Sequence, residues 1–331
     1  MGEVRVKPSH TTPCVHSLII HSFFTILSWM GDIRQIITKT DLSYILGSNE
    51  MKMRFLMLMK QQWDVPTKLN RKGQEVVDIK LIGGVDEYII THWDYNVCKH
   101  ILRDMFKETE KYKRGQTAKE VFNQNKLSYV ERGFLDCKWP FVATQFDDYA
   151  VKTVVYPTVA DISTLPKNLN KIQKDIEKFS YLKIFNTLRN DYIEYLMFTT
   201  DVDIIPTFSH RGGIDFYIHG IGFDQKVSRS VTNQFMEKHG DQWREQAINN
   251  PLEVAEFLMV LGDEARFSNV PRLFVIDVDG TYDLDGIEDK VKSIDFDSPS
   301  EVTYTYNHKS TGPKEYTCPV LCMMITSQSV K

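Results

Sequence analysis

The sequence predicts an α/β protein in which helices flank a mixed central sheet, and three stretches of the chain carry this prediction. Apolar residues recur at helical spacing from Phe179 to Phe198. Residues alternate between apolar and polar from Ile214 to Val227, around a Gly220-Ile221-Gly222 turn, which is typical of a β-hairpin. Arg272 to Val278 form a near-continuous apolar run, as expected of a strand buried on both faces.

The first half of the chain predicts an α+β region. Residues 30–64 have helical spacing, and Ser48 can cap a second helix within them. Residues 76–82 and 87–91 are rich in β-branched residues and are separated by two glycines, which predicts a β-hairpin. A helix is expected over residues 93–111.

A capping box that begins at Thr117 predicts another helix. The apolar residues within 139–156 then favour strands. We place a domain boundary near Pro157, so that residues 1–157 form the N-terminal α+β region and residues 158–331 form a second unit.

Composition describes an ordinary globular chain without a basic field around the whole protein. The 331 residues are 42% hydrophobic and 25% charged, with a formal net charge of −4. A nucleic-acid surface would therefore have to be a local patch of lysine and arginine. Five cysteines without a CxxC pair favour structural thiols in a reducing cytoplasm over a zinc site.

Only one segment near the N-terminus has the apolar character of a targeting or membrane sequence. Leu18 to Trp29 are apolar but too few to span a bilayer, so no membrane partner is expected. Met30-Gly31-Asp32 would serve as an alternative start, and residues 1–29 are interpreted as a leader that the fold does not need.

The hairpin carries the residues with the clearest chemistry. Pairing across the glycine turn brings Asp215 beside Asp224 and Lys226. Asp224 and Lys226 are two positions apart on a strand, so their side chains leave the same face. Two carboxylates suit Mg²⁺, and a lysine can hold an attacking water or neutralise developing negative charge, which together predict phosphodiester hydrolysis. The alternative is a surface hairpin with solvated charges.

These residues resemble a known motif. Asp215, followed nine positions later by Asp224-Gln225-Lys226, resembles the PD-(D/E)xK nuclease motif, most closely that of type II restriction endonucleases, although Ile214 replaces the usual proline. The resemblance implies a restriction-endonuclease-like core with the order helix, three-stranded meander, helix, strand. It also implies that Asp215 and Asp224 bind Mg²⁺ and that Lys226 assists the water.

The resemblance extends to further ligands and to partners. The carbonyl of Gln225 would add a metal ligand, and an acid on the preceding helix, Glu194 or Asp191, would reach the cluster. Glu194 is preferred because it lies closer to the strand entry, although a solvated carboxylate explains either residue equally well. The partner would be double-stranded DNA, and a palindromic target would imply a homodimer.

Several polar residues are candidates for contacts with nucleic acid. Ser228 and Arg229 follow the active strand directly, and Arg211 precedes the hairpin. Lys113 and Arg114 form the least balanced basic stretch of the first half and are predicted to contact phosphate. Caps and solvated helix faces are the competing interpretations.

A second motif lies in the apolar strand and its end. Phe274 to Thr281, with Asp277 and Asp279, is similar to motif I of haloacid dehalogenase-like phosphatases, in which the first aspartate is the nucleophile. Only 50 residues follow Thr281, and they predict antiparallel β structure in place of the parallel α/β core that this family needs. A buried strand running into an Asp/Gly turn explains the same residues.

The sequence therefore predicts a cytoplasmic Mg²⁺-dependent DNA endonuclease with a nuclease core over residues 158–331 and a DNA-gripping module over residues 1–157. The alternatives are the phosphatase and a DNA-binding protein with a catalytically silent nuclease fold.

Overall fold

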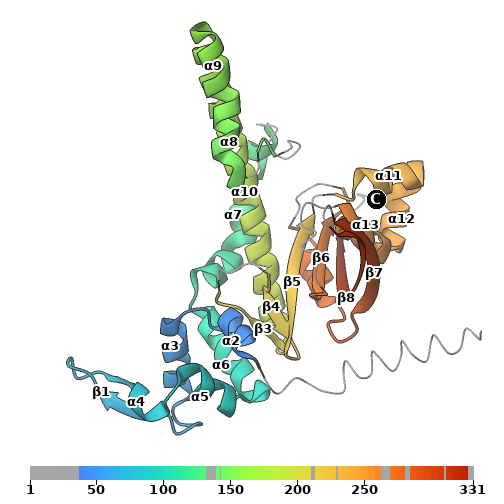
Figure 1. Cartoon of the computed structure of the whole chain (residues 1–331). Coiled ribbons are helices and arrows are strands. Elements are labelled where there is room, and N and C mark those ends of the chain that lie inside the picture. The colour runs from blue at the N-terminus through green and yellow to red at the C-terminus, as the bar shows by residue number, and fades with distance from the viewer. Residues whose placement is uncertain are drawn as a thin grey trace, which may run out of the picture.

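The computed structural model describes most of the chain as a mixed α+β molecule that contains a six-stranded sheet (Figure 1). The described residues are 37–131, 139–141, 143–209, 213–228, 230–261, 269–279, 284–308 and 311–326.

The sheet has the strand order β3-β4-β5-β6-β8-β7 and is mixed, as the sequence predicts. Its strands are β3 (Ile204–Pro206), β4 (Phe216–Ile218), β5 (Ile221–Ser228), β6 (Arg272–Asp277), β7 (Ser300–His308) and β8 (Gly312–Ile325). The first three strands form an antiparallel meander. The pairs β5–β6 and β6–β8 are parallel, and β7 is antiparallel to β8. The predicted hairpin is thus β4 and β5, and the antiparallel end of the chain is β7 and β8.

Strand β6 lies inside the sheet and is buried along its whole length. Leu273 and Val275 pack into the core on one face, and Phe274 and Ile276 pack into the core on the other. The prediction of a strand buried on both faces is confirmed.

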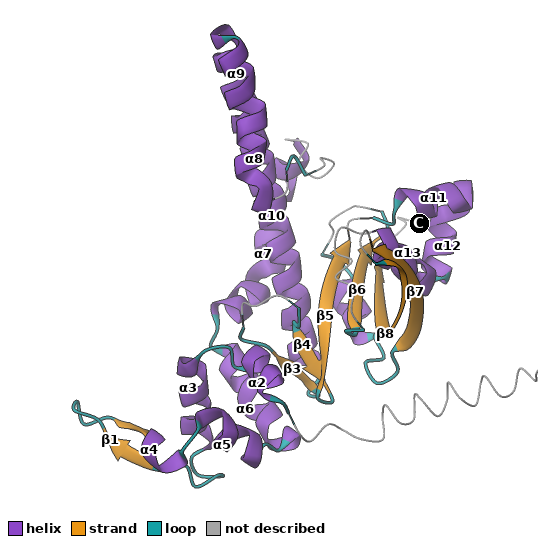
Figure 2. Ribbon diagram, viewed as in Figure 1, coloured by secondary structure: helices purple, strands orange, loops and turns teal. Residues whose placement is uncertain are grey.

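Helices cover both faces of the sheet (Figure 2). The core on the first face contains residues of α10 (Leu165–Thr200) and α14 (Ile287–Lys292). The core on the second face contains residues of three helices, α11 (Asn233–His239), α12 (Trp243–Asn249) and α13 (Pro251–Leu261). Helix α11 is followed by a 3-10 turn, η4 (Gly240–Gln242), where Gly240 has a φ of 54°.

The N-terminal half is mainly helical and shares both of its cores with the second half. Its elements are α2 (Lys39–Ile45), α3 (Asn49–Met59), β1 (Thr67–Leu69), β2 (Glu75–Val77), α4 (Ile79–Ile82), α5 (Val85–His92), α6 (Tyr95–Lys107) and α7 (Glu110–Glu131). Ile205 and Tyr217 of the sheet pack into the core of α2 to α6. Phe106 and Phe122 pack into the core beneath α10. Residues from both sides of Pro157 therefore build the same cores.

Helix α10 has 36 residues and extends far beyond the sheet (Figure 1). Helix α7 packs along its second half, where Phe122 meets Phe185 edge to face at 5.3 Å. The segment between them packs along the first half and consists of η1 (Ala143–Gln145), α8 (Phe146–Ala150), the π-helix η2 (Val151–Val155), α9 (Tyr156–Ala160) and η3 (Ile162–Thr164). Residues 143–184 are called the helical arm below.

The predicted hairpin over residues 76–82 and 87–91 is wrong. A shorter hairpin pairs β1 with β2, and residues 79–92 form α4 and α5. The side chain of Asp78 caps α4 by accepting from the amide of Lys80, and Gly83 ends this helix with a φ of 74°. These local signals, together with burial of Ile89 in the N-terminal core, outweigh the β-branched composition.

The predicted strands within residues 139–156 are also wrong, because the described residues there that adopt regular structure are helical. Helix α10 offers these residues a long surface to pack along. Phe141 stacks on Phe179 of α10 at 4.7 Å, and the hydroxyl of Tyr149 bonds the carboxylate of Asp175. This tertiary packing overrides the β propensity of Val151, Val154 and Val155.

The contact between α7 and α10 predicts a large loss of stability when it is opened. Phe185→Ala should lower the free energy of unfolding by ~3–5 kcal/mol, because it leaves a cavity beside Phe122. The neighbouring Ile184 is 46% exposed, so Ile184→Ala should cost less than ~1 kcal/mol. Chemical denaturation of both variants checks this, and equal losses would contradict the packing.

Candidate metal and phosphodiester site

The candidate site lies where β5 changes partner. Strand β5 pairs with β4 as far as Phe223, and from Asp224 onward it pairs with β6. Asp215 stands directly before β4. The two aspartates therefore lie on either side of the point at which β4 and β5 separate. Beyond this point the backbone of β5 no longer pairs with β4 and can bond to side chains.

Asp224 and Lys226 leave the same face of β5 and form an ion pair. The Nζ of Lys226 lies 3.0 Å from the Oδ1 of Asp224. Asp224 is only 5% exposed, and Arg272 is its register partner on β6. Burial of the carboxylate is thus accompanied by a cation on its own strand and another on the next.

Asp215 is held against the same stretch of β5 by two hydrogen bonds. Its amide donates to the carbonyl of Phe223 at 2.8 Å, and its Oδ2 accepts from the amide of Gln225 at 2.7 Å. The carboxylate of Asp215 therefore accepts the hydrogen bond of the Gln225 amide in place of a backbone carbonyl. Gln225 is the residue between Asp224 and Lys226. Asp215, Asp224 and Lys226 are called the carboxylate cluster below.

The electrostatics of the cluster make the ionisation of Asp224 costly. Burial raises the pKa of Asp224 above its ordinary value, Lys226 opposes this shift, and the charge of Asp215 adds to it. A carboxylate that is costly to ionise next to a second carboxylate gains most from a cation placed between them. Oxygen ligands of this kind suit a hard ion such as Mg²⁺.

Glu194 lies on α10 and is 6% exposed. Burial raises its pKa to about 7, against the effect of an ion pair with Lys111 of α7, and the charge of Asp215 raises it further. Glu194 is thus within electrostatic range of the cluster, but its nearest partner is a lysine.

The donor set fits an ion that takes part of its coordination from elsewhere. Among the residues that the structure describes, no group of three His, Cys, Asp or Glu side chains is placed to hold a metal ion. Asp215 and Asp224, with the predicted carbonyl of Gln225, would supply part of an octahedral shell. Mg²⁺ is usually bound by one or two carboxylates together with water and substrate phosphate, and two carboxylates match that number of protein ligands.

The predicted nucleic-acid contacts are placed unevenly. Arg211 and Arg229 lie outside the described residues. Ser228 ends β5, and its hydroxyl donates to the carbonyl of Ser230 at 2.5 Å. Lys113 pairs with Glu110 at 2.6 Å on the exposed face of α7, and Arg114 pairs with Asp191 of α10 at 2.7 Å.

The acids of the second motif are bound by arginines. Asp277, at the end of β6, is buried, with a carboxylate oxygen 3.7 Å from Arg189 of α10. Asp279 accepts two hydrogen bonds from Arg244 of α12, at 2.6 and 2.9 Å. Each carboxylate thus ties the end of β6 to a helix that covers the sheet.

Two features of the site were not identified from the sequence. Lys111 and Arg272 supply positive charge to Glu194 and Asp224 from elements distant in the chain. Gly115 allows α7 to approach α10, since a Cβ there would lie 2.4 Å from the carbonyl oxygen of Asp191. A glycine in the middle of a helix pattern is the one signal of this approach that the sequence offers.

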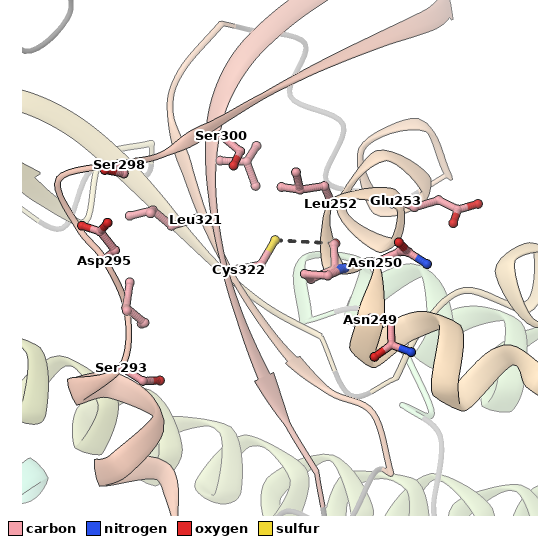
Figure 3. Close-up of a pocket in the computed structure, with 13 residues that line it drawn as sticks. Asn249, Asn250, Leu252, Glu253, Ser293, Asp295, Ser298, Ser300, Leu321 and Cys322 are labelled. Atoms are coloured by element: carbon pink, nitrogen blue, oxygen red, sulfur yellow. Dashed lines mark hydrogen bonds between the residues drawn. The ribbon is translucent and has the colours of Figure 1, made fainter. Parts of the chain in front are cut away.

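A separate open pocket of about 510 Å³ lies beside β8 (Figure 3). Its lining includes Asn250, Asp295 and Cys322 but none of the carboxylate cluster. The thiol of Cys322 donates to the carbonyl of Pro251 at 3.6 Å, and burial raises its pKa to about 12. This thiol is therefore not a nucleophile at neutral pH.

Comparisons with protein-family models, curated proteins and solved structures found no match to this chain. Within the described residues, every helix is too short or too polar to cross a membrane.

The raised pKa of Glu194 predicts a pH-dependent effect of its removal. Unfolded Glu194 loses its proton near pH 4.5, whereas folded Glu194 keeps it until about pH 7. Stability is therefore lost as the pH rises between these values, by at most about 3 kcal/mol. Glu194→Gln mimics the protonated acid at every pH, so its stability relative to the wild type should improve from pH 5 to pH 8.

Denaturation at several pH values measures this difference. Glu301→Gln removes an exposed carboxylate from β7 and is the matched control. A difference between Glu194→Gln and the wild type that stays constant across this range would contradict the buried, protonated acid.

Proposed function

We propose that this chain is a Mg²⁺-dependent endodeoxyribonuclease of the type II restriction endonuclease kind. The contact that carries the proposal is the carboxylate of Asp215 bonded to the backbone beside the Asp224–Lys226 ion pair. Two acids and one lysine lie where strands β4 and β5 separate. They correspond to the catalytic residues of the PD-(D/E)xK motif.

The order of elements supports the same proposal. Helix α10 is followed by the meander β3-β4-β5, then by α11 to α13, and then by β6 in parallel with β5. This is the order that the resemblance implies for a restriction-endonuclease-like core. The paired arginines at Asp277 and Asp279 give no support to the phosphatase alternative, because both carboxylates serve as structural anchors.

The roles of the residues follow from their positions. Asp215 and Asp224 would hold Mg²⁺, with the carbonyl of Gln225 as a further ligand and Glu194 as an auxiliary acid. The bound ion would act as a Lewis acid on the scissile phosphate. Lys226, whose side chain is 18% exposed, can reach water from its place beside Asp224 and would hold the attacking water in line with the phosphorus. The proposed substrate is double-stranded DNA in the cytoplasm.

Removal of either member of the ion pair tests the proposal. Asp224→Ala and Lys226→Ala should each lower Mg²⁺-dependent plasmid cleavage by at least ~100-fold, because the first removes a proposed metal ligand and the second removes the group that would hold the attacking water. Gel analysis of supercoiled plasmid gives the rates, and thermal denaturation shows whether the variants remain folded.

The control for these variants is Glu301→Gln, which should cleave as the wild type does. Cleavage by folded Asp224→Ala at the wild-type rate would overturn the proposed site. DNA binding without cleavage by the wild type, in Mg²⁺ or Mn²⁺, would indicate a catalytically silent nuclease fold. Hydrolysis of a small phosphate ester that is lost in Asp277→Asn would favour the phosphatase.

Binding of the ion can be measured without activity. Mg²⁺ should raise the midpoint of thermal unfolding of the wild type, because an ion that binds the folded state alone stabilises it. Asp215→Asn should abolish this increase, since it removes one negative charge from the cluster. An equal increase in the wild type and in this variant would place the ion elsewhere.

A further inference from the structure

The rings of Phe146, Tyr149 and Phe179 in the helical arm pack against Phe141, but the described side chains of the arm before Leu182 form no fully buried core. In α8, η2 and α9 every residue is at least partly exposed, and the first buried residue of α10 is Leu182. Isolated helices are marginal in water, and most helical stability in proteins comes from packing of an apolar face. An arm whose described residues before Leu182 are all at least partly exposed would gain stability from a further surface to pack against.

Apolar side chains occupy the outer surface of the leg that leads to the tip of the arm. Val155 and Val159 are four positions apart, and they are 46% and 81% exposed. Tyr156 lies between them at 65% exposure, and Ile162 at the tip is 72% exposed. Residues spaced by four lie on one face of a helix, so these side chains form a continuous patch.

The returning leg, α10, carries a matching stripe. Leu169 and Ile176 are seven positions apart and are 48% and 40% exposed. A spacing of seven keeps apolar residues along one seam of a helix and is the spacing with which helices pair in coiled coils. Both legs of the arm thus present apolar residues at the spacings used for helix–helix contacts.

The two legs carry opposite charge. Residues 143–164 contain three aspartates and one lysine, whereas residues 165–184 contain five lysines and two acids. When two arms are related by a two-fold axis, the acidic leg of each can lie against the basic leg of the other. Such isologous pairing makes the surface complementary to itself.

We infer that the helical arm pairs with the arm of a second copy of this chain to form a four-helix bundle. The apolar residues of both legs would form the core of the bundle, and the lysines of one copy would face the aspartates of the other. Nucleic acid would meet the lysines but would leave Val159 and Ile162 in water. The inference stands on the arm alone and does not depend on the proposed cleavage.

Sedimentation of the full chain tests the inference. The wild type should be a dimer at about 10–100 µM, and Val159→Glu combined with Ile162→Lys should weaken the dimer at least tenfold, because charges then enter the bundle core. Leu81→Glu is the matched control, since Leu81 is 70% exposed but lies on α4 in the N-terminal half. The Leu81→Glu variant should remain dimeric.

A charge exchange distinguishes pairing of arms from any other contact. Asp147→Lys with Asp148→Lys makes the acidic leg basic, and Lys167→Glu with Lys174→Glu makes the basic leg acidic. Each double variant should dissociate because like charges would then face each other, and a mixture of the two should form a heterodimer. All of these substitutions are on the surface, so circular dichroism should show unchanged helix content.

Three results would overturn the inference. They are a monomeric wild type over the whole concentration range, a dimer that both charge variants retain, and a mixture that fails to associate although each variant alone is monomeric. Loss of DNA binding in Lys167→Glu with Lys174→Glu, together with a monomeric wild type, would identify the arm as a nucleic-acid contact. None of these readouts involves cleavage, so their outcome is separate from that of the proposed activity.

Discussion

The repulsion between two carboxylates held beside one strand is the constraint that organises this protein. Asp224 lies in a region that is largely closed to water, where ionisation is costly, and the charge of the partly buried Asp215 adds to this cost. The fold meets this cost with groups from both sides: Lys226 from the same strand, the amide of Gln225, and Arg272 from the neighbouring strand. The proposed bound cation would reduce the same cost further.

Helix α10 also buries charged residues against the first face of the sheet and places them beside opposite charges. Its second half buries several charged residues, and each lies close to a group of opposite charge from another element: Asp191 to Arg114, Glu194 to Lys111, and Arg189 to Asp277. Close approach of α7, which Gly115 permits, makes the first two pairs possible. Breaking one of these buried pairs would leave an uncompensated charge, so they fix the position of α10 against α7 and the sheet.

The sequence predicts the structure well where local residue patterns determine it, and poorly where contacts between distant parts of the chain determine it. Alternation around Gly220 located β4 and β5, and the apolar run at Leu273 to Ile276 identified a strand buried on both faces. Strands were predicted within residues 139–156 because their valines favour β structure, but α10 lies alongside residues 151–156 and holds them as helix. The ion pair of Glu194 with Lys111 joins residues 83 positions apart, and no spacing rule predicts it.

The continuity of α10 links the arm to the site. Leu169 in the arm and Glu194 beside the cluster belong to one unbroken helix, and the 25 residues between them span about 38 Å at the usual rise. A shift of the arm along the axis of α10 would therefore also move Glu194. If two arms pair, the register of their apolar stripes sets the separation of the two carboxylate clusters. Under the proposed nuclease activity, the distance between two cuts in a DNA duplex would then be decided by residues far from the proposed metal ligands.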